Sequence, residues 1–422
     1  MCFPDSLRRI AVSLTIIMLV ACGGAGNAVI PPVVIGSSIP GNNVLAIMSD
    51  AGPAGAAYQV NRLYTDITIC QPGTSPSICE TIDHVLVDTG SSGLRLLASE
   101  VPGRLGLNKL TGSTGFALLN CAQFVDTSFA WGPVAVADIT LGNMTASSVP
   151  IQIVADPGYQ SAVPAACSAG GVAITSVIGT GSGALGAKGI LGIGQLQQDC
   201  GPACVSAGRG YYYTCTNTGC TTAISSATPL DMQLTNPVTK FATDYNGLVV
   251  YLPTVPATGA VSVSGSIVFG VGSQANNVTT GTTLLKNSKA NPYITAVLNT
   301  FGLTGLTKAQ SFLDTGSNGL FFDAPLATCP NSASSSSHFY CPPSTTTVAA
   351  MLTGSNNVAA SGAFAVSSPT FASGTYVMPQ LAGPMNESST FDGGLPFFFG
   401  RRIFIGIEGM PSPLGTGPFY AF

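Results

Sequence analysis

The stretch Val85-Leu86-Val87-Asp88-Thr89-Gly90-Ser91-Ser92-Gly93-Leu94 returns, with small changes, as Ser311-Phe312-Leu313-Asp314-Thr315-Gly316-Ser317-Asn318-Gly319-Leu320. In both copies an apolar run typical of a strand ends at an Asp, and a Gly two residues later turns the chain. The second Asp follows the first by 226 residues. We therefore expect two lobes that each bring one carboxylate to a shared site. The alternative is that Asp and Gly only mark the ends of two unrelated strands.

Two carboxylates held side by side do not ionise together easily, because each negative charge disfavours the other. One group then keeps a proton while its partner loses one, and the titration belongs to the pair. Such a pair offers a general acid and a general base in one place, with a water molecule between them as the nucleophile. This chemistry requires no metal and no cofactor, and we predict none.

The composition favours an all-β protein. The chain has 422 residues, of which 45% are hydrophobic, only 8% are charged and 51 are Gly. This length suits two domains, and abundant Gly with little charge is typical of strands joined by tight turns. Disorder is the alternative explanation of low charge, but disordered chains are poor in apolar residues. The net charge of −4 provides no basic surface for nucleic acid, and the two histidines, His84 and His338, make a histidine metal site improbable.

The N-terminus has the pattern of an export signal. Arg8 and Arg9 precede an apolar run at 10–21 that is too short to span a bilayer. The run ends in Leu-Val-Ala-Cys-Gly-Gly and resembles a bacterial lipobox, which predicts a signal peptide over 1–22 and lipidation of Cys22. A plain signal peptide with an incidental Cys is the alternative. We expect an exported lipoprotein of the bacterial cell envelope, anchored by lipid at the outer membrane or facing the periplasm, with a flexible linker over 23–43.

Ten cysteines remain when Cys2 and Cys22 are set aside, and an even number in an exported chain predicts disulfides. Close neighbours in sequence would staple loops, and sequence alone does not fix the connectivity. A zinc site at Cys200 and Cys204 would lack both the usual spacing and the histidines. The neighbouring pairs are Cys70/Cys79, Cys215/Cys220, Cys329/Cys341 and the tight Cys200/Cys204, with Cys121/Cys167 left over.

Each Asp-Thr-Gly copy follows a predicted hairpin. Residues 64–69 and 81–87 read as two strands joined by a turn, and the second of them delivers Asp88. Residues 293–298 and 309–313 repeat this arrangement before Asp314. The motif and its supporting hairpin thus form an internal repeat.

These residues resemble the pepsin-like aspartic proteases, over about 44–422. In that family an apolar-apolar-Gly segment packs beneath each catalytic loop. Lys188-Gly189-Ile190-Leu191-Gly192-Ile193-Gly194 resembles the first such segment, and Leu395-Pro396-Phe397-Phe398-Phe399-Gly400-Arg401-Arg402-Ile403-Phe404 resembles the second. Residues 265–270 resemble the strand that opens the second lobe, and 124–142 lie where the flap hairpin is expected. The resemblance implies a bilobal all-β fold with a cleft, an N-terminal lobe over 44–237 and a C-terminal lobe over 238–422.

The resemblance also implies roles for the repeated residues. Asp88 and Asp314 would be the catalytic pair. The two Thr residues would brace the loops against each other, the two Ser residues would orient the carboxylates, and the two Gly residues would let the backbone turn close to the acids. These supporting residues are Thr89, Gly90, Ser91, Thr315, Gly316 and Ser317.

Three departures from the family pattern bear on turnover. The family's flap carries a Tyr, but no Tyr lies between Asp88 and Gly142, and Trp131, expected near the hairpin tip, is the flap candidate. Arg95 stands where the family usually has a Trp. Arg401 and Arg402 follow Gly400, where the family commonly has an acidic residue. A cation that points toward the carboxylates would lower their pKa values, and an outward-facing Arg would not.

The function predicted from these residues is an exported aspartic endopeptidase, expected as a monomer, that hydrolyses peptide or protein substrates. The alternative is an envelope protein of the same fold that binds peptide or polysaccharide without turnover. Two further patterns carry less weight. Residues 181–186 match a dinucleotide fingerprint but lack its strand–helix context, and a serine hydrolase would need a His placed as the base.

Overall fold

The computed structural model describes residues 31–74, 78–179, 183–287, 292–300, 303–330, 339–371, 374–385 and 387–422. Residues Pro31–Phe422 form one compact unit. The predicted signal peptide, Cys22 and His338 lie outside the described residues, as do parts of the stretches at 181–186 and 23–43. Within the described part of the chain, no helix is both long enough and apolar enough to cross a membrane.

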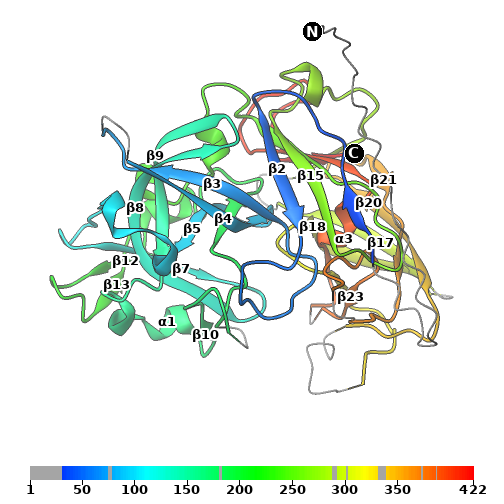
Figure 1. Ribbon diagram of the computed structural model, residues 1–422, viewed down its shortest axis with the longest axis horizontal. Coiled ribbons are helices and arrows are strands. Elements are labelled where there is room, and N and C mark those ends of the chain that lie inside the picture. The colour runs from blue at the N-terminus through cyan, green and yellow to red at the C-terminus, as the bar shows by residue number, and fades with distance from the viewer. Residues whose placement is uncertain are drawn as a thin grey trace, which may run out of the picture. The chain divides into compact units, whose positions relative to one another are not determined.

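The regular secondary structure of the described chain is mostly β-strand, as predicted, and the strands form two sheets (Figure 1). The larger sheet contains β1 (Val33–Ile35), β2 (Val44–Ser49), β3 (Tyr64–Cys70), β4 (Cys79–Asp88), β5 (Ser92–Leu97), β6 (Asn108–Lys109), β7 (Leu118–Gln123), β8 (Ser128–Leu141), β9 (Met144–Val154), β10 (Val172–Ala173), β11 (Gly189–Ile193), β12 (Tyr212–Cys215), β13 (Ala223–Ser225), β14 (Gly247–Tyr251), β15 (Ser262–Phe269), β16 (Leu284–Lys286), β25 (Arg402–Gly406) and β26 (Phe419–Ala421).

The smaller sheet is built from the strands between β16 and β25, and helices are few and short. Its strands are β17 (Ile294–Thr300), β18 (Leu303–Leu313), β19 (Leu320–Phe322), β20 (Thr346–Thr353), β21 (Ala359–Ser361), β22 (Phe364–Val366), β23 (Ala382–Gly383) and β24 (Thr390–Gly393). The α-helices are α1 (Ala165–Ser168), α2 (Ala203–Ser206) and α3 (Leu395–Phe398), and the 3-10 turns are η1 (Ala98–Glu100), η2 (Gly103–Leu105), η3 (Gln160–Ala162), η4 (Leu230–Met232), η5 (Pro237–Lys240) and η6 (Ala275–Asn277).

The first Asp-Thr-Gly loop joins β4 to β5, and β11 lies between these two strands. β3 and β4 form the predicted hairpin. β11 pairs in parallel with β4 and antiparallel with β5. All five residues of β11 are buried, which suits a strand that is flanked on both sides by the sheet. The segment predicted at 188–194 to support the first loop therefore does so.

The second loop repeats this arrangement. β17 and β18 form the predicted hairpin, and the loop then joins β18 to β19. β24 pairs in parallel with β18 and antiparallel with β19. The two sheets thus contain the same crossed arrangement around the two copies of the motif. This duplication confirms the predicted bilobal all-β fold.

The support of the second loop lies a few residues before its predicted place. The prediction over 395–404 is wrong in register, because 395–398 form α3 and 402–406 form β25 of the larger sheet. The strand under the loop is β24, Thr-Phe-Asp-Gly. Its sequence contains an acid where the first copy is apolar, so an apolar-apolar-Gly pattern does not find it.

The larger sheet takes strands from both ends of the sequence. β15 covers most of the stretch expected to open the second lobe and pairs antiparallel with β2 (Figure 1). On its other edge β15 pairs with β14, and β14 pairs with β25. β1 pairs in parallel with β15, so residues 33–35 are part of the sheet, unlike the flexible linker predicted there. The lobe boundary at residue 237 stays a prediction.

The five disulfides join the cysteines that are neighbours in sequence and the pair that was left over. Cys121–Cys167 closes the longest separation, 46 residues, and ties β7 to α1. The other four close separations of 4 to 12 residues. These four are Cys70–Cys79, Cys200–Cys204, Cys215–Cys220 and Cys329–Cys341.

Candidate active site

The two loops are joined through their threonines. The amide of Thr315 donates to Thr89 Oγ1 at 3.0 Å, and the amide of Thr89 donates to Thr315 Oγ1 at 3.2 Å. Each hydroxyl then donates across to a backbone carbonyl of the other loop, Thr89 to Leu313 at 3.2 Å and Thr315 to Val87 at 2.8 Å. Both threonines are buried. Buried polar groups need such partners, so this exchange fixes one loop against the other.

The carboxylates of Asp88 and Asp314 meet at the amide of Gly90. This amide lies 2.8 Å from Asp88 Oδ1 and 3.0 Å from Asp314 Oδ1. The amide of Gly316 donates to Asp314 Oδ1 at 2.7 Å. A Cβ on Gly90 would lie 2.7 Å from Asp314 Cγ, so only Gly fits there. The predicted pair is therefore brought together by backbone amides.

The two serines contact the outer oxygens of the pair. Ser91 Oγ lies 2.5 Å from Asp88 Oδ2, and Ser317 Oγ lies 3.0 Å from Asp314 Oδ2. Each carboxylate is thus held at one oxygen by an amide and at the other by a hydroxyl. These are the contacts that the resemblance to the pepsin-like proteases implied for Ser91 and Ser317.

The environment of Asp314 favours its protonated form. Burial raises its pKa well above the ordinary value, and the neighbouring Asp88 and Asp392 carboxylates raise it further. The amide of Gly316 acts in the opposite direction. A carboxyl group that keeps its proton beside a second carboxylate can serve as a general acid while the other serves as the base.

Asp392 is a site residue that the sequence reasoning missed. It lies in β24 and is buried, with Oδ2 at 2.6 Å from Ser317 Oγ. Burial raises its pKa to about 8, and Asp88 adds to this effect while Ser317 opposes it. The available signal was a single acid in an otherwise apolar segment, immediately before two glycines.

Trp131 does not lie at the tip of the predicted flap hairpin. The hairpin consists of β7 and β8 with its turn at 124–127, and Trp131 is opposite Cys121 within the paired strands. Trp131 is buried, its Nε1 donates to the carbonyl of Tyr159 at 2.9 Å, and its ring packs edge-on against Tyr213. Trp131 was expected at the flap, but its side chain is part of the core.

The rest of this hairpin is also held by neighbouring strands and by a disulfide. The edge of β7 that faces away from β8 pairs with β12, and the first residues of β8 pair with β10. The Cys121–Cys167 disulfide adds a covalent link from β7. Strand pairing on both outer edges satisfies the backbone groups that a projecting hairpin would leave to solvent.

Arg95 is buried, and its charge is matched by an acid. Its Nη2 lies 3.4 Å from Asp199 Oδ2, and its Nη1 donates to the carbonyl of Ser92 at 3.0 Å. Asp199 also accepts from Tyr212 at 2.5 Å and from Asn120 at 2.9 Å. Burial raises the pKa of Asp199, and these three partners oppose the shift. Arg95 therefore belongs to a buried network next to the first loop.

The two later arginines also have their own contacts. Arg401 stacks over the Phe397 ring at 4.4 Å and donates to two backbone carbonyls. Arg402 lies over the rings of Tyr251 and Phe404. None of the three arginines is among the groups that shift the pKa of Asp314.

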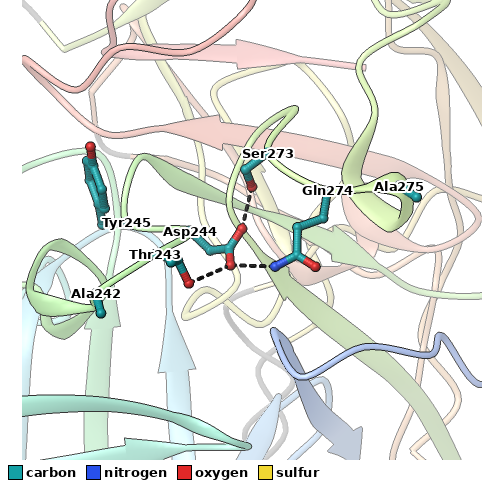
Figure 2. A pocket seen from close by; sticks show the side chains of 7 residues that line it. All are labelled: Ala242, Thr243, Asp244, Tyr245, Ser273, Gln274 and Ala275. Carbon is teal, nitrogen blue, oxygen red and sulfur yellow. Dashed lines mark hydrogen bonds between the residues drawn. The ribbon is translucent and has the colours of Figure 1, made fainter.

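A hollow lined by the segments 242–245 and 273–275 lies elsewhere on the protein (Figure 2). Its central acid, Asp244, accepts hydrogen bonds from Ser273, from Thr243 at 3.0 Å and from Gln274 at 2.6 Å. Through these hydrogen bonds the Asp244 carboxylate links the two segments. Its lining includes no residue of the two Asp-Thr-Gly loops, so the candidate active site remains the Asp88–Asp314 pair.

Comparisons with known proteins extend over most of the chain. Residues 40–422 match the family described as "Protein of unknown function (DUF3443)". Among solved structures, one match is the crystal structure of an aspartic proteinase from Irpex lacteus, with 15% sequence identity and a TM-score of 0.45. This match covers 90% of the present chain and 96% of the proteinase. A search of curated proteins finds no match.

Proposed function

The chain belongs to the DUF3443 family, and from this starting point we propose that it is an aspartic-type endopeptidase that hydrolyses peptide bonds at Asp88 and Asp314. The observation that carries the proposal is the joint placement of two carboxylates around one amide. Gly90 N lies 2.8 Å from Asp88 Oδ1 and 3.0 Å from Asp314 Oδ1. A carboxylate with only a structural role would not require a second carboxylate at the same amide, since like charges repel.

The proposed reaction uses a water molecule held between the two carboxyl groups. The ionised carboxylate removes a proton from this water as its oxygen attacks the carbonyl carbon of the peptide. The protonated carboxyl group donates its proton to the carbonyl oxygen, which gives a neutral tetrahedral diol. The carboxyl group that took the proton from water then gives it to the amide nitrogen, and the other carboxylate takes a proton from a diol hydroxyl. The carbon–nitrogen bond breaks, the products are a carboxylic acid and an amine, and both acids return to their starting states. The raised pKa of Asp314 supports its assignment as the initial acid.

Access to the pair is consistent with a substrate that approaches from solvent. Gly90 is exposed, and Asp314, Gly316 and Ser317 are partly exposed, whereas Asp88 and both threonines are buried. Solvent therefore reaches this site at Gly90 and at Asp314, and backbone amides and hydroxyls hold the two carboxylates in place. Preorganised groups of this kind stabilise charge as it develops in the transition state.

We also propose that the protein acts outside the cytoplasm as a lipid-anchored envelope protein. The five disulfides favour an oxidising compartment, and the export pattern with Cys22 supplies the anchor. Labelling the cells with a radioactive fatty acid tests this. A Cys22→Ser variant that still incorporates the label and stays with the membrane would contradict the anchor.

Cleavage of an unfolded protein substrate from acid to neutral pH tests the proposed activity, with the disulfides of the enzyme intact. Asp88→Asn and Asp314→Asn should each abolish cleavage, because each removes one half of the acid–base pair. Circular dichroism establishes that both variants are folded. Asp231→Asn, an exposed acid on η4, is the matched control and should retain wild-type activity.

A second candidate function is a binding protein without turnover. The observation that favours it is the hairpin of β7 and β8, whose only Trp is buried and whose outer edges are paired. A mobile hairpin that closes over the substrate contributes to turnover in many enzymes. Folded wild-type protein that binds peptides or polysaccharides and cleaves none at any pH would favour this second function.

A further inference from the structure

Ser317 lies between two carboxyl groups. Its Oγ is 3.0 Å from Asp314 Oδ2 and 2.6 Å from Asp392 Oδ2. Asp392 is buried in β24, and its other oxygen, Oδ1, is also buried and has no hydrogen-bond partner in the described structure. The third carboxyl group thus contacts the reacting pair through a single hydroxyl.

One hydroxyl group has one hydrogen to donate, so it cannot donate to both carboxylates. If both acids were ionised, one of the two short contacts would join oxygens with no hydrogen between them. A hydrogen on either acid removes this conflict, but Asp314 gives up its proton to the substrate in the proposed reaction. Only a hydrogen on Asp392 removes the conflict throughout, because Asp392 then donates to Ser317 Oγ and Ser317 donates to Asp314. The unpartnered Oδ1 favours the same state, since a buried ionised carboxylate needs several donors.

We propose that Asp392 is a positioning residue that stays protonated and fixes the direction of a hydrogen-bond chain, Asp392 to Ser317 to Asp314, at the catalytic pair. This proposal deepens the proposed function and rests on it where it concerns turnover. The chain keeps the Ser317 hydroxyl aimed at Asp314 Oδ2 in every turnover. Asp314 then has one fixed orientation relative to Asp88.

The first loop lacks this device. Ser91 Oγ contacts Asp88 Oδ2 at 2.5 Å, and the strand beneath that loop, β11, has the sequence Gly-Ile-Leu-Gly-Ile without any acid. The two halves of the site are therefore alike in their Asp, Thr, Gly and Ser residues and differ in this third carboxyl group. Such a difference assigns unequal roles to two otherwise equivalent acids.

The groups that face Asp392 favour its neutral form. Asp314 and Asp88 are acids, and the hydroxyl of Tyr420, on β26, is near both Asp314 and Asp392. Tyr293 is beside Tyr420. Among the described residues, no Lys or Arg is one of the groups that shift the pKa of Asp392.

Two substitutions at Asp392 separate a neutral donor from a charge. Asp392→Asn places an amide N–H where the proposal has an acid O–H, and we expect kcat within about threefold of wild type below pH 8. Asp392→Ala removes the donor, and we expect kcat to fall by about tenfold or more, with KM changed less. Ser317→Ala should cause a similar loss, and its combination with Asp392→Ala should add little.

The outcomes decide the proposal. Equal losses in Asp392→Asn and Asp392→Ala would mean that the ionised carboxylate is needed, and wild-type turnover in both would mean that Asp392 positions nothing. Either result overturns the proposal. The matched control is Asp231→Ala, which removes an exposed carboxylate and should leave kcat unchanged.

Infrared spectroscopy provides a readout that does not depend on turnover or on the alanine variant being folded. At pH 7 the wild type should show the carbonyl stretch of a protonated carboxyl group in a buried site, and Asp392→Asn should lose part of this band. An unchanged band in Asp392→Asn overturns the protonated state. If the wild type cleaves no substrate while the band behaves as expected, the proposed activity fails and the hydrogen-bond chain is retained.

Discussion

The amide of Gly90 donates to Oδ1 of Asp314 at 3.0 Å, across 224 residues of sequence. The same amide is 2.8 Å from the Asp88 carboxylate of its own loop. One backbone N–H therefore contacts the Oδ1 atoms of both acids and keeps these two oxygens close together. The close approach requires the absence of a side chain at residue 90.

Gly90→Ala should reduce cleavage by about 100-fold, because its Cβ would lie within 2.9 Å of three atoms of the Asp314 carboxylate and would move this group. Measurement of kcat/KM with the unfolded protein substrate checks this. Gly103→Ala is the matched control, because a Cβ at residue 103 would meet no atom within 4 Å. Full activity in Gly90→Ala would show that the two acids do not need this spacing.

Thr89→Val and Thr315→Val should each lower the free energy of unfolding by about 1–3 kcal/mol, since each leaves buried backbone groups of the opposite loop without a partner. The double variant should cost less than the sum, because the two hydroxyls belong to one network. Urea denaturation measures all three. Thr140→Val, which removes a solvent-facing hydroxyl on β8, should change stability by less than about 0.5 kcal/mol.

Arg95→Met should destabilise the protein by about 3–5 kcal/mol, because it leaves the buried Asp199 carboxylate without its cation. Arg95→Met combined with Asp199→Leu should recover most of this loss, since no buried charge then remains. Lys109→Met breaks the more exposed pair with Asp156 and should cost no more than about 1 kcal/mol. Thermal unfolding of the wild type and the three variants measures these losses of stability. An equal cost for the two single substitutions would contradict the buried-pair interpretation.

The free energy of unfolding should fall as the pH rises from about 4 to about 8. In this range the folded protein keeps the Asp392 proton, with a pKa of about 8, whereas the unfolded chain loses it near the ordinary value of 3.8. The folded state therefore binds more protons, which gives a negative slope of up to about 1.4 kcal/mol per pH unit for this group. Asp392→Asn should make the slope less negative, and the slope that remains belongs to Asp314, whose pKa is also raised. Urea denaturation at each pH measures both slopes.

A group with the opposite shift is the control for this pH dependence. A hydrogen bond from Lys188 lowers the pKa of Asp83 to about 2, so its contribution is present above pH 4 and is lost as the pH falls toward 2. Asp83→Asn should leave the slope between pH 4 and pH 8 unchanged. A slope in this range that is unchanged in Asp392→Asn would place the whole of the proton uptake on another group, with Asp314 the first to examine.

Local sequence was sufficient for the elements that depend on neighbours along the chain. The two hairpins, the two Asp-Thr-Gly loops and the short disulfides all involve strand patterns, turns or cysteines a few residues apart. The support of the first loop followed from an apolar run with glycines. These features need only period-two patterning and turn chemistry.

The features that sequence did not give are contacts between distant residues, one missed turn and one interrupted pattern. The partner of Arg95 is 104 residues away in sequence, and no local pattern indicates that the pair is buried together. Trp131 was placed at a hairpin tip because the turn at 124–127 was not identified. Asp392 interrupts the apolar pattern that was used to locate the second support, so the search moved to the next apolar run, at 395–404.

The strand order of the larger sheet also determines when the site can exist. β2, near the start of the described chain, pairs with β15, and β14 pairs with β25, whose residues are 402–406. A ribosome that has released the first loop has not yet made its partner loop or the strands that complete the sheet. The paired acids therefore assemble only after residues 402–406 have been made, and the nascent polypeptide carries no formed site before that point.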